Sequence, residues 1–278
     1  MNLWQADFYR RPLQDEAGNP LWELVVCAAD RSFTASAYCP QPEANSAWIA
    51  QQLQRWIETE GTPDRIQVFR PQSVSLLQAA CQPLGIAVEP TRRTPVLKQQ
   101  LQARVQEYRT LPNYTGQPYE PVQLEQPPPV PLPENLWGNQ WRFAAIEAPE
   151  LQRFQHRPIP ILEMPEVFLP LKLQLPSTAL IPGVVIDGGR RSMPLAQWIQ
   201  RSKPVALNYI PGQPDGLILE AGLVERWILT TFEDPEVITA ARTFQQRQHT
   251  AKGLHFLLVQ PDDSGMTYSG FWLLQKEF

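Results

Sequence analysis

The first part of the chain alternates hydrophobic and polar positions, as extended strands do. Aromatic and branched aliphatic side chains are concentrated in residues 3–9, 21–27 and 33–38. Residues 14–20, between the first two of these segments, are rich in residues that form turns. The pattern therefore predicts three consecutive antiparallel strands.

After these strands the apolar spacing changes to three and four residues, which is the helical period. One apolar stripe consists of Trp48, Ile49, Leu53, Trp56 and Ile57. Asn45 or Ser46 is placed to cap this helix. Two further helices follow, and the second starts at Thr94 and Pro95, with a hydroxyl N-cap and a proline at the first helical position.

Short strands expected at residues 65–69 and 86–88 complete the order β-β-β-α-β-α-β-α over residues 1–111. This is the order of elements in ribonuclease-H-like domains. We therefore expect an α/β protein with mixed sheets, whose N-terminal domain, residues 1–111, is ribonuclease-H-like.

Nucleases with that fold hold two metal ions with carboxylates. The first strand offers Asp7, but the fourth runs into Phe69, Arg70 and Pro71, where a carboxylate is needed. We interpret the domain as a scaffold without catalytic carboxylates and expect no enzyme activity. A metal-dependent nuclease is the weaker alternative, which magnesium-dependent RNA cleavage lost in Asp7→Ala would support.

Residues 112–136 form a predicted linker. Eight prolines fall between Pro112 and Pro133, a composition that favours extended polyproline II and a semi-rigid spacer. Residues 137–278 then mix strand-like and helix-like segments, with a helix start at Asp234 and Pro235. We expect a second α/β domain there, although residues 150–180 give no clear pattern.

Composition limits the class of protein. Hydrophobic residues make up 43% of the chain and charged residues 19%, so a disordered chain is excluded. The net charge is −4, whereas nucleic-acid-binding domains often have a pI above ~9. Any RNA site must therefore be a local patch on an acidic protein.

No apolar run reaches the ~20 residues that a membrane-spanning helix needs. The N-terminal residues lack the features of a secretory signal or an organelle transit peptide, so we expect a cytoplasmic location, in a bacterial-type cytosol. The three cysteines are widely spaced and odd in number, which argues against disulfides. Cys27 and Cys81 are expected to be core thiols.

No metal or cofactor site is expected. The histidines are scattered and no Cys-x-x-Cys is present, whereas zinc ligands cluster at short spacing. Pro214-Asp215 and Glu220 loosely resemble a nuclease signature, but Gly222 occupies the place of its lysine. An ordinary turn is the better interpretation of this segment.

Candidate RNA contacts come from arginines at predicted element boundaries. These basic pairs are Arg10-Arg11, Arg92-Arg93 and Arg190-Arg191. If they converge, they could hold an RNA backbone while exposed aromatic side chains stack on bases. The loop around Gly188 and Gly189 is either a solvated loop or, less favoured, an anion-binding loop, because no phosphate-binding glycine motif is present.

Three longer segments carry a family resemblance. They read DFYRRP at residues 7–12, PLPENLWGNQWRF at residues 131–143 and SGFWLLQ at residues 269–275. Together they resemble the Tab-type translation-factor family of cyanobacteria, algae and plants.

The resemblance implies an RNA-binding factor, without enzymatic activity, that supports translation or biogenesis of photosystem subunits. Its implied partner is the 5′ untranslated region of a photosystem I reaction-centre messenger, with the ribosome or photosystem assembly proteins as further partners. Trp272, Leu273 and Leu274 match the Trp-Leu-Leu tripeptide that the family associates with RNA binding. Core packing is an equally good interpretation of the two leucines. A protein–protein scaffold in photosystem assembly is the alternative function.

Overall fold

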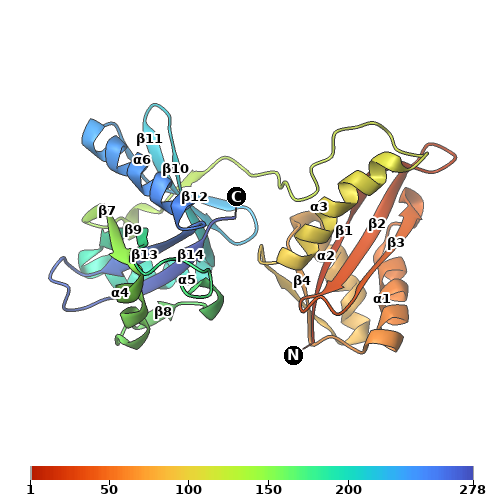
Figure 1. The fold of residues 1–278 in the computed structure, drawn as a ribbon, viewed down its shortest axis with the longest axis horizontal. Helices are drawn as coiled ribbons and strands as arrows, with labels where there is room; N and C mark the ends of the chain where they lie inside the picture. The colour runs from red at the N-terminus through yellow and green to blue at the C-terminus, as the bar shows by residue number, and fades with distance from the viewer. Residues whose placement is uncertain (1, 278) are drawn as a thin grey trace. The chain divides into compact units, whose positions relative to one another are not determined.

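The computed structural model describes residues 2–277 of the chain. It divides into two compact units, unit 1 ending at Glu125 and unit 2 beginning at Gln126 (Figure 1). Within the described residues there are three mixed sheets and six α-helices, which confirms the mixed α/β class. In this part of the chain, no helix is both long and apolar enough to cross a membrane.

Unit 1 is built on a five-stranded sheet with the order β3-β2-β1-β4-β5. Its strands are β1 (Leu3–Gln14), β2 (Pro20–Ala28), β3 (Thr34–Pro40), β4 (Arg65–Val68) and β5 (Ala87–Pro90), and its helices are α1 (Ser46–Glu60), α2 (Pro71–Cys81) and α3 (Pro95–Thr110). The first three strands are antiparallel, and β4 and β5 are parallel to β1. The expected order of elements is therefore found, while the ribonuclease-H-like assignment stays a prediction.

The two faces of this sheet carry different side chains because residues alternate along a strand. Trp4 and Phe8 of β1 belong to the apolar core beneath α1 and α2. Gln5 lies on the other face, where its side chain accepts a hydrogen bond from Leu97 N of α3 at 3.0 Å. Figure 1 shows α1 and α2 on one side of the sheet and α3 on the other. The polar positions of β1 are thus buried beneath α3.

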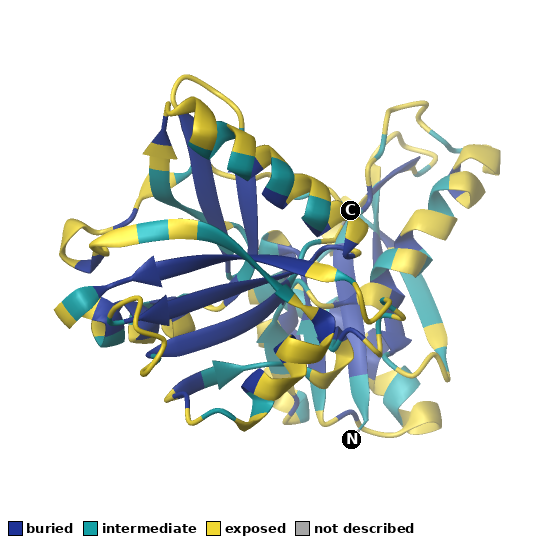
Figure 2. Cartoon of the chain, turned by 60° about the vertical axis from the view of Figure 1, so that its left-hand side comes forward, coloured by how far each residue is buried: buried dark blue, intermediate teal, exposed yellow. Residues whose placement is uncertain are grey.

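Unit 2 contains two sheets, with the orders β7-β9-β13-β14-β8 and β10-β11-β12-β6. Its strands are β6 (Val130–Pro131), β7 (Gln140–Glu147), β8 (Ile161–Glu163), β9 (Leu180–Asp187), β10 (Pro204–Ile210), β11 (Asp215–Ala221), β12 (Glu225–Phe232), β13 (Leu254–Gln260) and β14 (Gly270–Gln275), and its helices are α4 (Ala148–Arg153), α5 (Ser192–Ser202) and α6 (Pro235–Thr250). The central strands β9, β13 and β14 are buried along most of their length (Figure 2). Burial on both faces explains their nearly continuous apolar sequence.

The proline-rich segment is partly packed on each unit. Arg70 donates a hydrogen bond to Pro121 O at 2.6 Å in unit 1. In unit 2, β6 pairs with β12, and Leu132 and Leu136 are buried. The segment expected as a spacer over residues 112–136 is therefore anchored to one unit or the other at Pro121, Leu132 and Leu136, while most of its other residues are exposed.

All three cysteines are buried and unpaired, which confirms Cys27 and Cys81 as core thiols. Burial raises the pKa of the Cys27 thiol to about 12 and that of Cys81 to about 11. Both thiols therefore stay protonated near neutral pH, in keeping with a packing role.

Candidate functional site

A cluster of charged side chains is buried on the α3 face of the unit 1 sheet. Arg70 Nε donates to Asp7 Oδ1 at 2.8 Å, and Arg11 Nη1 donates to Asp7 Oδ2 at 3.1 Å. Arg11 Nε donates to Glu23 Oε2 at 2.8 Å, and Arg104 Nη1 donates to Glu23 Oε1 at 2.6 Å. The side chains of Asp7, Arg11 and Glu23 are 0% exposed. We use the name charge cluster for Asp7, Arg11, Glu23, Arg70 and Arg104 together.

Tyrosine hydroxyls complete the surroundings of the charge cluster. Tyr108 donates a short hydrogen bond to Glu23 Oε2, and Arg11 Nη1 donates to the Tyr119 hydroxyl at 2.5 Å. Burial raises the pKa of Tyr119, with Arg11 acting in the opposite direction. The Tyr119 hydroxyl therefore stays protonated, and because its oxygen accepts from Arg11, its own hydrogen remains available to a further acceptor.

The charge cluster bears directly on the nuclease hypothesis. Both Asp7 oxygens are occupied by guanidinium groups. One of these groups belongs to Arg70, which lies two residues beyond the end of β4, near the position where a nuclease needs a second carboxylate. Asp215, in the segment with a loose nuclease resemblance, accepts from the Tyr209 hydroxyl at 2.6 Å and from Gly212 N at 2.8 Å. These contacts support the turn interpretation of that segment.

An open cleft of about 440 Å³ lies beside the charge cluster within unit 1. Residues 9–12, Arg70, 117–120 and 123–125 line it, and we call it the arginine cleft. The basic pair Arg10-Arg11 is split here, because Arg10 is exposed while Arg11 is buried in the charge cluster. A direct contact of Arg11 with an RNA backbone at the surface is therefore not compatible with its position.

The second basic pair lies between β5 and α3. Arg92 is half-buried and Arg93 is exposed. Lys98 Nζ donates to the Arg92 carbonyl at 2.7 Å, and Arg93 N donates to Thr91 Oγ1 at 3.1 Å. Neither arginine lines the arginine cleft, so these two pairs of unit 1 do not form one continuous site.

The third pair, Arg190 and Arg191, follows β9 in unit 2, and both are exposed. The backbone N–H groups of this loop are already used, because Gly188 N donates to Gln260 O at 2.8 Å and Gly189 N donates to Pro261 O at 2.9 Å. A loop that holds a phosphate needs free backbone N–H groups. The anion-binding interpretation of the glycines is thus not supported, and only the arginine side chains are available.

Arg191 lies against the segment of residues 134–137. Its Nη1 atom lies 3.3 Å from Glu134 O and 3.5 Å from Trp137 O. Trp137 is 51% exposed, and its Nε1 atom donates to Leu132 O at 2.9 Å, which holds the indole in place. An exposed aromatic ring and an exposed arginine are therefore neighbours at this surface.

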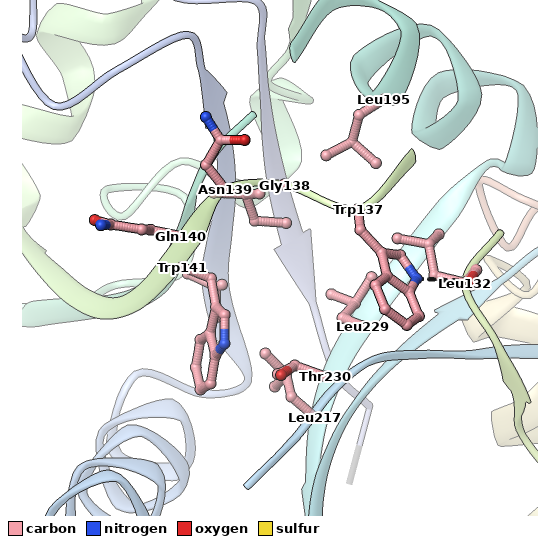
Figure 3. A pocket seen from close by; sticks show the side chains of 12 residues that line it. Leu132, Trp137, Gly138, Asn139, Gln140, Trp141, Leu195, Leu217, Leu229 and Thr230 are labelled. Atoms are coloured by element: carbon pink, nitrogen blue, oxygen red, sulfur yellow. Dashed lines mark hydrogen bonds between the residues drawn. The ribbon is translucent and has the colours of Figure 1, made fainter. Parts of the chain in front are cut away.

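A pocket of about 150 Å³ opens beside Trp137, between the two sheets of unit 2. Its lining consists of Leu132, residues 137–141, Val184, Ile186, Leu195, Leu217, Leu229 and Thr230. Figure 3 shows the Trp137 and Trp141 indoles on two sides of this space, while the Asn139 and Gln140 side chains point away from it. We call it the tryptophan pocket; its walls are apolar and aromatic.

Trp272, Leu273 and Leu274 lie in β14 and are at most 1% exposed. Trp272 and Leu274 belong to the core beneath α5 and α6, whereas Leu273 belongs to the core on the opposite face of the sheet. Strand alternation thus buries all three side chains. A surface contact with RNA is not compatible with this placement, which favours the indirect, structural role for the leucines and extends it to Trp272.

Trp137, Trp141, Arg70 and Tyr119 were not expected at a site. The sequence around Trp137 could have predicted its exposure, because this residue stands among prolines and polar residues rather than on an apolar stripe. No comparable signal marks Tyr119, whose contact with Arg11 spans 108 positions.

Two family models match most of the chain. The model described as "RNA-binding protein Tab2/Atab2 N terminal" matches residues 3–104. The model described as "RNA-binding protein Tab2/Atab2, C-terminal domain" matches residues 119–275. The two matches fall on the two compact units.

Curated relatives match over nearly the whole chain. "Protein TAB2 homolog, chloroplastic" of Zea mays is 32% identical over 281 residues, covering 98% of this chain and 70% of the relative. The protein of the same name from Arabidopsis thaliana is 29% identical and covers 98% of this chain and 74% of the relative. A solved structure of the HTLV-2 integrase catalytic core domain with magnesium is 15% identical, covers 41% of this chain and 77% of that one, and has a TM-score of 0.28, too low to carry an argument.

Proposed function

The chain belongs to the Tab2/Atab2 family of RNA-binding proteins, and from this premise we propose that it binds single-stranded RNA through Trp137, Arg190 and Arg191 of unit 2. The observation that carries the proposal is the exposed side chain of Trp137 on a residue whose carbonyl oxygen lies 3.5 Å from Arg191 Nη1. Proteins that bind single strands combine aromatic platforms with positive charge in this way.

The two kinds of side chain have separate tasks. A base stacks on Trp137 at the opening of the tryptophan pocket, with an expected gain of ~1–3 kcal/mol. Arg190 and Arg191 neutralise backbone phosphates next to that base. Because the chain as a whole carries a net charge of −4, this local positive charge has to overcome a general repulsion of RNA.

The biological role follows from the resemblance. We propose that the chain, without enzymatic activity of its own, supports synthesis of photosystem subunits by binding the 5′ untranslated region of a photosystem I reaction-centre messenger. The chloroplastic names of the relatives support a setting in which such messengers are translated, a cyanobacterial cytosol or a chloroplast stroma. In this proposal Trp272, Leu273 and Leu274 support the RNA surface from within the core.

The test is binding of a labelled photosystem I reaction-centre 5′ leader over a salt series, with an unrelated RNA of equal length beside it. The logarithm of affinity falls with that of salt by ~0.7 for each phosphate contact to a single strand. The double variant Arg190→Gln/Arg191→Gln is expected to lower this slope by ~1.4.

The matched control is Arg153→Gln/Arg201→Gln, which removes two other exposed arginines of unit 2 and is expected to leave the slope unchanged. An equal decrease of the salt slope in both double variants would show that RNA affinity depends only on the net charge of the chain. Absence of binding at low salt would reject direct RNA recognition and favour the protein–protein scaffold.

A further inference from the structure

The charge cluster of unit 1 is not electrically balanced. Three guanidinium groups, those of Arg11, Arg70 and Arg104, face only two carboxylates, those of Asp7 and Glu23. The Arg11 Nη2 atom is buried and has no hydrogen-bond partner among residues 2–277. A buried positive charge without a full set of partners is costly, so this region of unit 1 favours an added anion.

Hydrogen-bond donors with spare capacity line the adjacent arginine cleft. Arg70 uses Nε for Asp7 and Nη2 for Pro121 O, and no hydrogen bond is formed by its Nη1 atom within residues 2–277. The Tyr119 hydroxyl accepts from Arg11 and so can donate its own hydrogen to a ligand. Arg10 adds an exposed guanidinium that has no ion pair within the described residues.

The size of the cleft and the charges around it also fit a small anion. Its volume of about 440 Å³ lies in the range of small-molecule sites. Glu120 and Glu125 also line the cleft, but both are exposed, so water and salt screen their charge. The buried guanidinium groups are screened far less, and their excess charge therefore dominates the inner part of the cleft.

We propose that the arginine cleft binds a phosphomonoester, with its phosphate oxygens held by Arg70, Tyr119 and Arg10. A phosphomonoester carries nearly two negative charges near neutral pH and three acceptor oxygens. These match the one uncompensated charge of the charge cluster together with the charge of Arg10, and the three available donors. The phosphate belongs either to the 5′ end of an RNA strand or to a free nucleotide or phosphate ion. This inference does not rest on RNA binding by unit 2.

The test is isothermal titration calorimetry of the full chain with five probes in a low-chloride buffer. Inorganic phosphate and adenosine 5′-monophosphate are expected to bind, and adenosine is not. The other two probes are a ten-nucleotide RNA of one sequence with and without a 5′-phosphate. If the 5′-phosphate raises the affinity for RNA about tenfold, the ligand of the cleft is the 5′ end of an RNA strand. If the two RNAs bind equally and the mononucleotide binds clearly, the ligand is a free phosphate compound. Failure of both phosphate and mononucleotide to bind, with no gain from the 5′-phosphate, overturns the proposal even where unit 2 binds RNA.

Variants assign the heat of binding to this cleft. Arg10→Gln and Tyr119→Phe are each expected to weaken mononucleotide binding about tenfold, as loss of one hydrogen bond to a charged group does. Glu120→Gln/Glu125→Gln is expected to strengthen it about twofold, a gain that a damaged fold does not produce. The control Arg31→Gln removes an exposed arginine from the β2–β3 turn and is expected to change nothing. Equal affinity in all of these variants overturns the assignment.

Discussion

Arg70 Nε lies 2.8 Å from Asp7 Oδ1 in the interior of unit 1, although the two residues are 63 positions apart in the chain. The contact exists because β4 lies parallel to β1 and brings Arg70, two residues beyond the end of β4 at Val68, next to the middle of β1. Together with Arg11, the arginine therefore neutralises the buried Asp7 carboxylate. It also joins the end of β4 to β1 by a polar contact that few alternative packings could satisfy.

Loss of the Asp7 charge is expected to destabilise unit 1. Asp7→Asn keeps the volume but leaves Arg11 and Arg70 with a neutral partner, and removal of one member of a buried ion pair costs ~3–5 kcal/mol. The free energy of unfolding in urea, followed by circular dichroism, measures the effect. Glu16→Gln, at an exposed turn position, is the control and should change stability by less than ~0.5 kcal/mol. A loss below ~1 kcal/mol in Asp7→Asn would mean that the cluster is not held by this carboxylate.

Local signals in the sequence were sufficient for most elements. Asn45 Oδ1 accepts from Trp48 N at 3.0 Å, and Asp234 Oδ1 accepts from Glu236 N at 2.8 Å, so both expected caps are confirmed. The helix expected at Thr94 also begins, at Pro95, but the Thr94 hydroxyl makes no cap bond and is buried without a partner. There the fixed backbone angle of proline suffices to start the helix.

Some elements were not predicted. β10, at residues 204–210, was missed, although its partner β11 is the next element in the chain and the two strands form a hairpin. Residues 150–180 contain the end of α4, two 3-10 helices of three residues, the three-residue strand β8 and turns, which are all too short for a periodic pattern. The difference in burial between Arg10 and Arg11 was also not predicted. It arises because neighbouring residues on a strand point to opposite faces of the sheet.

Truncation of β14 side chains is expected to lower stability without a specific effect on RNA. Leu274→Ala removes a fully buried side chain, and such changes cost ~2–5 kcal/mol. The midpoint of urea unfolding should fall accordingly. The RNA dissociation constant, measured at 10 °C on the fraction that stays folded, should remain within about twofold of the original value. A large loss of affinity at unchanged stability would instead place the tripeptide at the RNA surface.

Substitution of Trp137 is expected to weaken RNA binding while having little effect on folding. Trp137→Ala should weaken binding about ten- to one-hundredfold, the equivalent of ~1–3 kcal/mol of stacking. Trp137→Phe retains a ring and should lose less, although it also loses the hydrogen bond to Leu132 O. The control Leu171→Ala removes an apolar side chain of unit 2 that is 76% exposed. Fluorescence anisotropy with the labelled leader measures all three variants, and an unchanged affinity in Trp137→Ala would exclude the tryptophan pocket as the base site.

His255 makes unit 2 sensitive to acid. Its Nε2 atom accepts from Leu207 N at 2.8 Å, which requires the neutral ring, and Nδ1 is placed to donate to Gly253 O at 2.7 Å. Burial lowers the pKa of His255 from 6.5 to about 4, and Lys276 acts in the same direction. Between pH 6.5 and 4 the unfolded chain therefore binds a proton that the folded chain does not. This contribution to stability is complete above pH 6.5 and is lost as the pH falls towards 4, by up to ~3 kcal/mol.

Unfolding in urea at several pH values between 7.5 and 4 tests this expectation. Carboxylates also add to acid unfolding, so the informative quantity is the difference between the original chain and His255→Gln. The variant is expected to be less stable at pH 7.5, because it repacks a buried position, and to lose less stability on acidification. His249→Gln, at an exposed position, should follow the original curve. Parallel curves for His255→Gln and the original chain would show that the His255 ring does not resist protonation in the fold.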